Sequence, residues 1–225
     1  MRQRPLILAF LCLIHMASMT WADPLRILVM GDSFMTSNGS VGHSVPAIIK
    51  RELPARVRST AVLGASYGYR LPITGALGLN ISKQYRKGPW DVVVMNGGGN
   101  DLWLGCGCSK CDARLERLIS RDGLSGQIPK AVTRAVAAGA QVFYVGYLRS
   151  PGVGSPIEHC RTLGDALEKR LQQMAKRYRA VTFVSLANLV PRGDRSFHAG
   201  DMIHPSPKGS TAAARRIIAA IKANR

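Results

Sequence analysis

The chain has 225 residues, of which 46% are hydrophobic and 20% are charged, a balance that fits one globular domain and excludes a disordered chain. Its 31 lysines and arginines against 13 acidic residues give a net charge of +18, which favours anionic partners. Nucleic acid is not expected, because the basic residues are scattered, aromatic residues make up only 6% and no known binding motif occurs. An acidic polysaccharide, a cell-wall polymer or an anionic lipid surface fits the charge better. A basic surface that serves only solubility is the alternative.

Residues 1–22 have the character of a signal peptide. Arg2 and Arg4 form a basic start, an apolar stretch of signal-peptide length follows, and the segment ends on a small residue, Ala22. The stretch is short for a membrane span, so an uncleaved anchor is the weaker alternative. We expect residues 23–225 to be secreted or periplasmic, monomeric and without a membrane span. Cleavage removes two arginines and no acidic residue, which leaves a net charge of +16.

Short apolar runs alternate with helix-like segments along the mature chain. The runs are almost continuously apolar, as in strands that are buried on both faces of a sheet. The expected strands are, in chain order, Leu25–Met30, Thr60–Leu63, Asp91–Asn96, Gln141–Tyr147 and Val181–Leu186. Helices are expected within Val41–Leu53, Thr74–Tyr85, Ser125–Ala138, Thr162–Arg179 and Pro207–Ala223, the last with Ser206 as its N-cap and Pro207 in its first turn.

This alternation predicts right-handed β-α-β crossovers and a parallel sheet of five strands with helices on both faces. In such a sheet the loops after the strands meet at one edge and bind ligands there. Ser33 lies just past the first expected strand, Gly64 just past the second, and the Asn96–Asp101 stretch "NGGGND" just past the third. Residues from three separate parts of the sequence are therefore expected to meet at one site.

Ser33 is either an ordinary loop serine or a nucleophile displayed at the end of the strand. A serine nucleophile needs a base, a group that orients the base, and donors for the oxyanion. His204 lies three residues after Asp201, a spacing that lets the carboxylate reach the imidazole from the same turn. A plain helix-entry turn is the alternative for this pair. Asn100 is either a turn residue or an oxyanion donor through its side-chain amide.

Four short motifs occur in a fixed order along the mature chain. They are Gly31-Asp32-Ser33, Gly64, Gly98-Gly99-Asn100-Asp101 and Asp201-Met202-Ile203-His204. Each is weak alone, but in this order they resemble the SGNH hydrolases, also called the GDSL-type esterase/lipase family, over essentially the whole mature chain. The resemblance implies a flavodoxin-like three-layer α/β/α sandwich and a triad of Ser33, His204 and Asp201. It also implies an oxyanion hole made of the Ser33 N–H, the Gly64 N–H and the Asn100 amide.

The resemblance further implies an exported serine esterase that hydrolyses carboxylic esters, either O-acyl groups of glycans or small and lipid esters. Neither a metal nor an organic cofactor is implied. The positive charge favours an anionic glycan or phospholipid as the substrate. An O-acyltransferase that acts on an envelope glycan is one alternative, since the same triad serves both reactions. A non-catalytic polyanion-binding envelope protein is another, but the intact set of candidate residues argues against it.

The sequence departs from the family pattern at three places. Phe34 replaces the leucine of the first motif. Gly64 lies four residues before the next glycine, Gly68, where the family spacing is often three, so the backbone oxyanion donor is either Gly64 or Ala65. The insertion Cys106–Cys111 after the third motif is not a general family feature, and it is expected to shape one wall of the cleft.

Other residues at this sheet edge are candidates for lesser roles. Asp32 and Asp101 are expected to support their loops rather than to act in catalysis, and His198 is expected to be a loop or rim residue rather than the base. The candidates for substrate contact, each with ordinary loop packing as its alternative, are Tyr67, Arg70, Trp103 and Arg149.

Four cysteines remain after the signal peptide is removed, an even number that fits two disulfides in an exported protein. They are Cys106, Cys108, Cys111 and Cys160. The sequence does not select a pairing, and a zinc site built from the same four thiolates is the alternative. In either case the cysteines are expected to pin the loop after Asp101 to the loop around Cys160.

Overall fold

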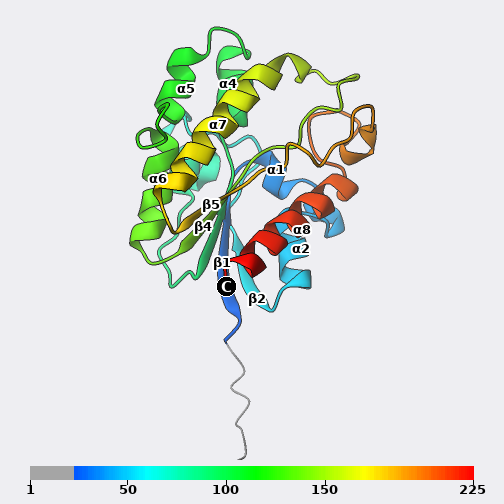
Figure 1. Ribbon diagram of the computed structural model, residues 1–225. Helices are drawn as coiled ribbons and strands as arrows, with labels where there is room; N and C mark the ends of the chain where they lie inside the picture. Colours follow the sequence, from blue (N-terminus) through cyan, green and yellow to red (C-terminus); the bar gives the residue numbers. More distant parts are fainter. Residues whose placement is uncertain (1–22) are drawn as a thin grey trace, which may run out of the picture.

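The computed structural model describes residues 23–225, which form a parallel five-stranded sheet between two layers of helices (Figure 1). The strand order is β2-β1-β3-β4-β5, and all four neighbouring pairs are parallel. The strands are β1 Leu25–Met30, β2 Ala55–Ser59, β3 Val92–Met95, β4 Gln141–Val145 and β5 Val181–Val184. The three-layer α/β/α sandwich predicted from the sequence is confirmed.

Four helices cover the sheet in two layers, one on each face. On one face α2 Val45–Glu52 packs beside α8 Pro207–Ala223, and on the other lie α6 Gln127–Ala137 and α7 Arg161–Arg177 (Figure 1). Successive residues of β1 alternate between the two layers: Ile27 and Val29 pack toward α2 and α8, whereas Leu28 and Met30 pack toward α6 and α7. Because both faces are covered, an unbroken apolar run is stable as a strand here.

Short helices occupy the carboxyl edge of the sheet and the connections around it. They are α1 Ser33–Thr36, η1 Gly39–Val41, α3 Pro72–Thr74, η2 Gly75–Leu79, η3 Ile81–Lys83, α4 Gly99–Cys106, α5 Asp112–Leu118, η4 Glu158–Cys160 and η5 Arg195–Phe197. Two of them, α1 and α4, begin directly after β1 and β3 and carry residues of the predicted site.

The prediction for the second strand is wrong, because the strand lies just before the predicted residues in the chain. The strand is Ala55–Ser59, and Thr60–Leu63 forms the loop that follows it. Continuous apolarity is the signature of a strand buried on both faces, but β2 lies at the edge of the sheet. An edge strand has a solvent-facing side, and the exposed Arg56 and Arg58 occupy alternate positions along it.

Two stretches that connect β2 to β3 and β3 to β4 also differ from the prediction. No continuous helix forms within Thr74–Tyr85, where the chain makes the short turns η2 and η3. Gly78 interrupts helical geometry there with a φ of +114°. Conversely, α4 and α5 were not predicted, since "NGGGND" and the cysteine insertion indicate loops. Tertiary packing overrides those local signals, and Leu102, Leu115 and other helical residues join the core.

The remaining helices agree with the sequence. The last helix spans Pro207–Ala223 as predicted, and the Ser206 hydroxyl caps it by accepting a hydrogen bond from the Gly209 N–H at 3.1 Å. The helices α2, α6 and α7 differ from the expected bounds by a few residues at their ends. The proposed signal peptide, residues 1–22, lies outside the described residues. Within residues 23–225 no helix has both the length and the apolar character to cross a membrane.

Candidate active site

Ser33 is placed by a tight turn at the end of β1. Gly31 makes the turn with a φ of +147°, and a side chain at this position would collide with the amide oxygen of Asn96. The buried Gln84 holds the turn from the other side: its Oε1 accepts a hydrogen bond from the Gly31 N–H at 2.7 Å, and its Nε2 donates to the Gly31 carbonyl at 2.8 Å. Ser33 follows as the first residue of α1 and is 8% exposed. The turn therefore presents a nearly buried serine at the sheet edge.

Asp32 supports this turn from beneath, as predicted. Its buried carboxylate accepts a hydrogen bond from the Phe34 N–H at 2.9 Å and another from the Tyr147 hydroxyl at 2.5 Å. The same hydroxyl accepts a hydrogen bond from the Gly99 N–H at 3.1 Å. Burial raises the pKa of Asp32 above its ordinary value, although these hydrogen bonds oppose the rise. The Tyr147 hydroxyl thus links Asp32, which precedes Ser33, to Gly99, which precedes Asn100.

Asp201 and His204 lie in one turn ahead of α8. The Asp201 carboxylate contacts the His204 Nδ1 at 2.6 Å and accepts a hydrogen bond from the His204 N–H at 3.0 Å. Met202 allows this reversal by adopting a left-handed φ of +57°, which is uncommon for a non-glycine residue. Burial opposes ionisation of Asp201, but the hydrogen bonds from the ring and from two backbone N–H groups outweigh it and hold the pKa below its ordinary value. The predicted contact within the turn is present.

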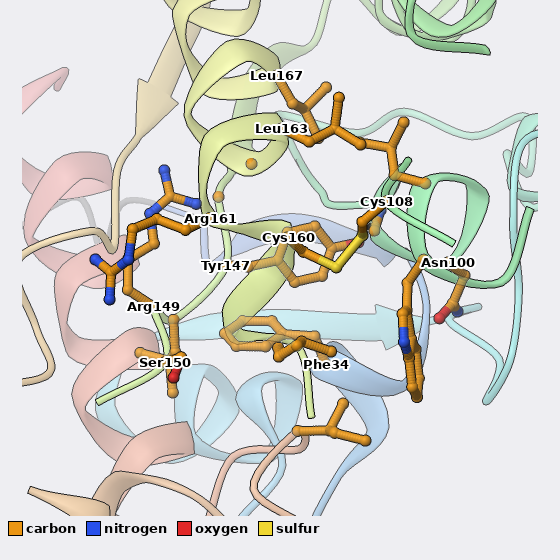
Figure 2. A pocket seen from close by; sticks show the side chains of 18 of the residues that line it. Phe34, Asn100, Cys108, Tyr147, Arg149, Ser150, Cys160, Arg161, Leu163 and Leu167 are labelled. Atoms are coloured by element: carbon orange, nitrogen blue, oxygen red, sulfur yellow. Dashed lines mark hydrogen bonds between the residues drawn. A yellow bond between two sulfur atoms is a disulfide. The ribbon is translucent and has the colours of Figure 1, made fainter. Parts of the chain in front are cut away.

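One pocket is lined by residues of three of the four motifs, and Figure 2 shows the part of its wall around Asn100 and Tyr147. Its lining includes Ser33, Asn100 and His204 but not Gly64, and its volume is about 140 Å³. Among residues 23–225 no hydrogen bond joins the Ser33 hydroxyl to the His204 ring; catalytic hydrogen bonds of this kind often tighten only when substrate binds. Apolar side chains make up much of the wall, and they include Phe34, Leu102, Leu163, Leu167 and Leu171.

The three predicted oxyanion donors differ in how they are held. Within residues 23–225 neither the Ser33 N–H nor the Gly64 N–H donates to an acceptor. The Ala65 N–H is engaged by the Val62 carbonyl at 3.1 Å, which favours Gly64 over Ala65 as a free donor. The Asn100 Nδ2 donates to the Ala65 carbonyl at 3.0 Å. Since a side-chain amide has two N–H groups, one fixes Asn100 and the other remains for a ligand.

Two of the four candidates for substrate contact lie away from the pocket. Tyr67 is 1% exposed in the core, where its hydroxyl accepts a hydrogen bond from Tyr144. Its apolar ring fills space beneath the sheet edge, so the prediction that it contacts substrate is wrong. Arg70 is exposed on the loop that follows and does not line the pocket. Asp101 anchors this loop, as expected, by accepting hydrogen bonds from the Tyr67 and Gly68 N–H groups.

The other two candidates, Trp103 and Arg149, do line the pocket. Figure 2 shows Phe34 and Tyr147 between Arg149 on one side and Asn100 on the other. The Arg149 guanidinium pairs with Asp165 at 2.6 Å and with the buried Glu168 at 3.4 Å. With both partners acidic, Arg149 carries little free charge, so the pocket is better suited to an uncharged acyl group than to a strong anion.

Sequence reasoning missed the side chains that position the nucleophile turn. Asn96 follows β3 and Tyr147 follows β4 at the same sheet edge. Their position after these strands could have indicated that they lie near Ser33. Gln84 has no such signal, because it reaches Gly31 from a distant turn. His198 was expected to be a loop or rim residue; it lies in the loop between η5 and α8 that also carries Asp201, but it is only 6% exposed, and burial lowers the pKa of its ring.

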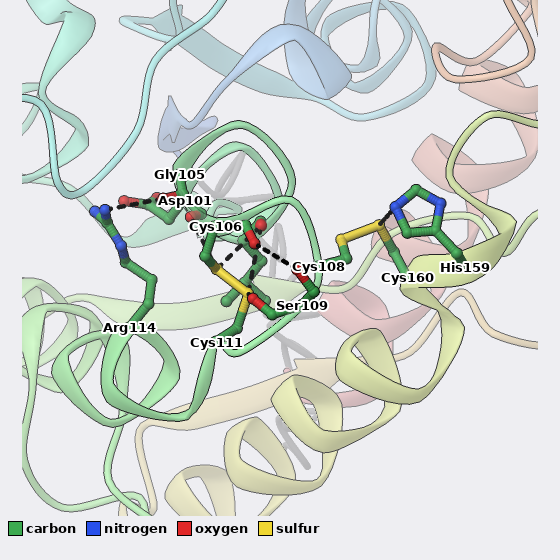
Figure 3. Close-up of a disulfide and its surroundings, with 10 residues drawn as sticks. Asp101, Gly105, Cys106, Cys108, Ser109, Cys111, Arg114, His159 and Cys160 are labelled. Carbon is green, nitrogen blue, oxygen red and sulfur yellow. Dashed lines mark hydrogen bonds between the residues drawn. A yellow bond between two sulfur atoms is a disulfide. The ribbon is translucent and has the colours of Figure 1, made fainter.

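Two disulfides hold the cysteine insertion (Figure 3). Cys106 pairs with Cys111 inside the α4–α5 turn, and Cys108 pairs with Cys160 at the start of α7. The second bond also lines the pocket and makes the predicted link between the two loops. Both pairs use the thiols that the zinc alternative requires, so this arrangement favours disulfides over a zinc site.

Loss of the Cys108–Cys160 bond is expected to destabilise the fold more than loss of the Cys106–Cys111 bond. The former closes a separation of 52 residues and the latter one of 5. Loop-closure entropy then predicts costs of about 4 and about 2 kcal/mol respectively. Urea unfolding of Cys108→Ser/Cys160→Ser beside Cys106→Ser/Cys111→Ser measures both values. The opposite order of stabilities would contradict this account of the insertion.

Comparison with known proteins places the chain in a family. The GDSL-like Lipase/Acylhydrolase family matches residues 29–212, which is most of the chain. The protein therefore belongs to this family. Membership makes it a hydrolase that acts on esters. No match is found among curated proteins.

Solved structures agree with this fold at low sequence identity. A protein of Slackia heliotrinireducens, provisionally classed as an SGNH hydrolase, is 22% identical with a TM-score of 0.63, covering 88% of this chain and 99% of the other. LAE5, an alpha/beta hydrolase from the metagenome of Lake Arreo in Spain, is 16% identical with a TM-score of 0.63, covering 91% and 98%. TesA is 19% identical with a TM-score of 0.59, covering 89% and 99%.

Proposed function

We propose that the protein is an exported serine esterase in which Ser33 is the nucleophile, His204 the base and Asp201 the residue that orients the base. The observation that carries this proposal is the shared pocket, which Ser33 and His204 both line, while Asp201 contacts the His204 ring at 2.6 Å. The two disulfides support export, because such bonds persist in oxidising compartments. The mature protein is then residues 23–225.

The reaction proceeds in two acyl-transfer steps. The Ser33 Oγ attacks the ester carbonyl while His204 Nε2 takes the hydroxyl proton, and Asp201 stabilises the imidazolium through Nδ1. The carbonyl oxygen becomes an oxyanion that accepts hydrogen bonds from the Ser33 and Gly64 N–H groups and from the Asn100 amide. His204 returns the proton to the departing alcohol as the C–O bond breaks. Water then attacks the acyl-serine in the same way and releases the acid.

Replacement of Asn100 by alanine is expected to lower kcat by about 10²- to 10³-fold with little change in KM. The amide stabilises charge that exists only in the transition state, so the ground-state complex is affected less. Steady-state kinetics on p-nitrophenyl butyrate measure the split between kcat and KM. Asn188→Ala, at an exposed position after β5, is the matched control. Wild-type kcat in Asn100→Ala would show that the Asn100 amide is not part of the oxyanion hole.

The pocket favours short acyl groups. Its volume of about 140 Å³ is close to that of an engineered cavity of about 150 Å³ that binds benzene. Acetyl or butyryl esters therefore fit, whereas a palmitoyl chain would extend into solvent. We expect kcat/KM for p-nitrophenyl butyrate to exceed that for p-nitrophenyl palmitate by at least about tenfold. Both esters are to be assayed at concentrations at which they stay dissolved as single molecules. Preference for palmitate would instead indicate a lipid-directed esterase.

The natural leaving group is proposed to be a glycan hydroxyl or a small alcohol, with a phospholipid ester as the competing proposal. The mature charge of +16 supports an anionic envelope substrate in either case. Transfer of the acyl group to a sugar would use the same residues, and product analysis with and without an acceptor sugar separates transfer from hydrolysis. Tight, salt-sensitive polyanion binding without any turnover would favour the non-catalytic binding protein.

A further inference from the structure

Four large apolar side chains are exposed on two segments near the carboxyl edge of the sheet, the loop after β2 and the stretch that contains α3 and η2. Leu63, Leu71, Ile73 and Leu77, here called the apolar rim, are 63 to 77% exposed. Isolated exposed leucines are ordinary, but a group of large apolar side chains on neighbouring loops indicates a contact surface. The segment from 71 to 79 contains no charged residue.

The two loops that carry the apolar rim are packed against each other. The Ser66 N–H donates to the Leu79 carbonyl at 2.9 Å, and the Ile81 N–H donates back to the Ser66 carbonyl at 3.1 Å. A side chain at Gly78 would collide with Val62, so η2 lies directly against the loop of Leu63. The two segments that carry the rim are therefore packed against each other, with Leu63 and Leu77 each next to a residue of this contact.

This surface adjoins the catalytic edge. Leu63 immediately precedes Gly64, and the next residue, Ala65, accepts the hydrogen bond from the Asn100 amide. Leu104 is also 68% exposed and lies on α4 next to Trp103, which lines the pocket. A partner that covers the apolar rim would thus lie close to the pocket mouth.

The charge of the surrounding chain indicates what kind of partner covers the rim. Between Glu52 and Asp91 there is no acidic residue, while six lysines and arginines occur. Within residues 23–225 none of these six forms an ion pair. They are Arg56, Arg58, Arg70, Lys83, Arg86 and Lys87. Exposed apolar side chains in a stretch of chain whose only charged residues are unpaired cations match a lipid surface, which has an apolar interior and anionic headgroups.

We propose that the apolar rim docks the protein onto an anionic lipid bilayer, with the rim side chains at the acyl boundary and the basic residues at the headgroups. Both parts contribute: apolar burial supplies attachment, and the cations select anionic lipid. Docking keeps the pocket at the membrane surface without a membrane span. The proposal does not depend on the identity of the ester substrate, because it concerns a surface outside the pocket.

Vesicle co-sedimentation tests the proposal with residues 23–225. The wild type is expected to bind vesicles of mixed phosphatidylcholine and phosphatidylglycerol, and to bind vesicles of phosphatidylcholine alone at least about tenfold more weakly. High salt, which shortens the Debye length to about 3 Å, should release it in part. Leu71→Ser/Ile73→Ser/Leu77→Ser should weaken binding at least about tenfold, while hydrolysis of soluble p-nitrophenyl butyrate continues at the wild-type rate. Arg58→Gln/Arg70→Gln should reduce the preference for anionic vesicles.

Leu124→Ser, at an exposed leucine outside the rim, is the matched control and should bind as the wild type does. Three results would overturn the proposal. The wild type could fail to bind anionic vesicles, or the triple serine variant could bind them undiminished. Gel filtration could also show a dimer that the triple variant converts to a monomer, with no vesicle binding by either form, and the rim would then be an interface between two copies.

Discussion

Ser33→Ala is expected to lower kcat for p-nitrophenyl butyrate by about 10⁴- to 10⁶-fold. Without Oγ no acyl-enzyme forms, and the oxyanion donors alone accelerate attack by water only weakly. The fold should survive, because Ser33 is held through its backbone: its carbonyl accepts hydrogen bonds from the Ser37 N–H and hydroxyl at 2.8 and 2.7 Å. Circular dichroism and unfolding midpoints of the variant should therefore match those of the wild type.

Ser40→Ala serves as the matched control for this substitution. Ser40 is exposed in η1, on the same sheet edge but outside the pocket. Its variant should retain wild-type kinetics, which excludes a general effect of removing a hydroxyl from this region. Persistent activity in Ser33→Ala, after contaminating esterases are excluded, would remove Ser33 from the role of nucleophile.

Asp201→Asn is expected to lower kcat by about 10⁴-fold. The carboxylate contacts His204 Nδ1 at 2.6 Å and fixes which ring nitrogen carries the proton. An amide at this position can donate to Nδ1 and hold the wrong tautomer, so Nε2 no longer accepts the serine proton. Measurement of kcat for the wild type and for Asp201→Asn from neutral to alkaline pH gives the size of this loss.

Asp194→Asn controls for the removal of a carboxylate near the same loop. Asp194 also caps a turn, by accepting a hydrogen bond from the Ser196 N–H at 2.9 Å, but it does not line the pocket. Asp194→Asn should lower the free energy of unfolding and leave kcat unchanged. If kcat of Asp201→Asn fell by less than about tenfold, far less than the loss expected for a Ser-His-Asp triad, Asp201 would not be the residue that orients His204. Either another residue would then orient His204, or His204 would not be the base.

The parts of the fold that the sequence predicts well are those in which local and tertiary preferences agree. The first strand and the last helix have the predicted bounds, since Ile27–Met30 is buried on both faces and Ser206 caps a helix with proline in its first turn. The motif residues were placed by their positions after strands. That rule needs only the strand order along the chain, so Ser33 and Asn100 could be assigned to one edge before the structure was known.

Other features could not be predicted because they depend on positions in three dimensions. The edge location of β2 permits arginines that a central strand would exclude, and a search for continuously apolar runs passes over the alternating Ala55–Ser59 for the apolar loop that follows. Tyr67 follows a strand just as a substrate-binding residue would, yet its ring points into the core. The support from Gln84 and Tyr147 to the nucleophile turn joins residues 53 and 115 positions apart, distances over which one sequence carries no pairing signal.

Covalent labelling by a fluorophosphonate, followed by mass spectrometry of the digested protein, tests the central claim most directly. The reagent phosphonylates only a serine that a base activates and that oxyanion donors surround. The account predicts one modified peptide, labelled at Ser33, in the wild type, and loss of the label in both Ser33→Ala and His204→Ala. Label on another serine, or esterase activity in wild-type protein that never labels at Ser33, would contradict it.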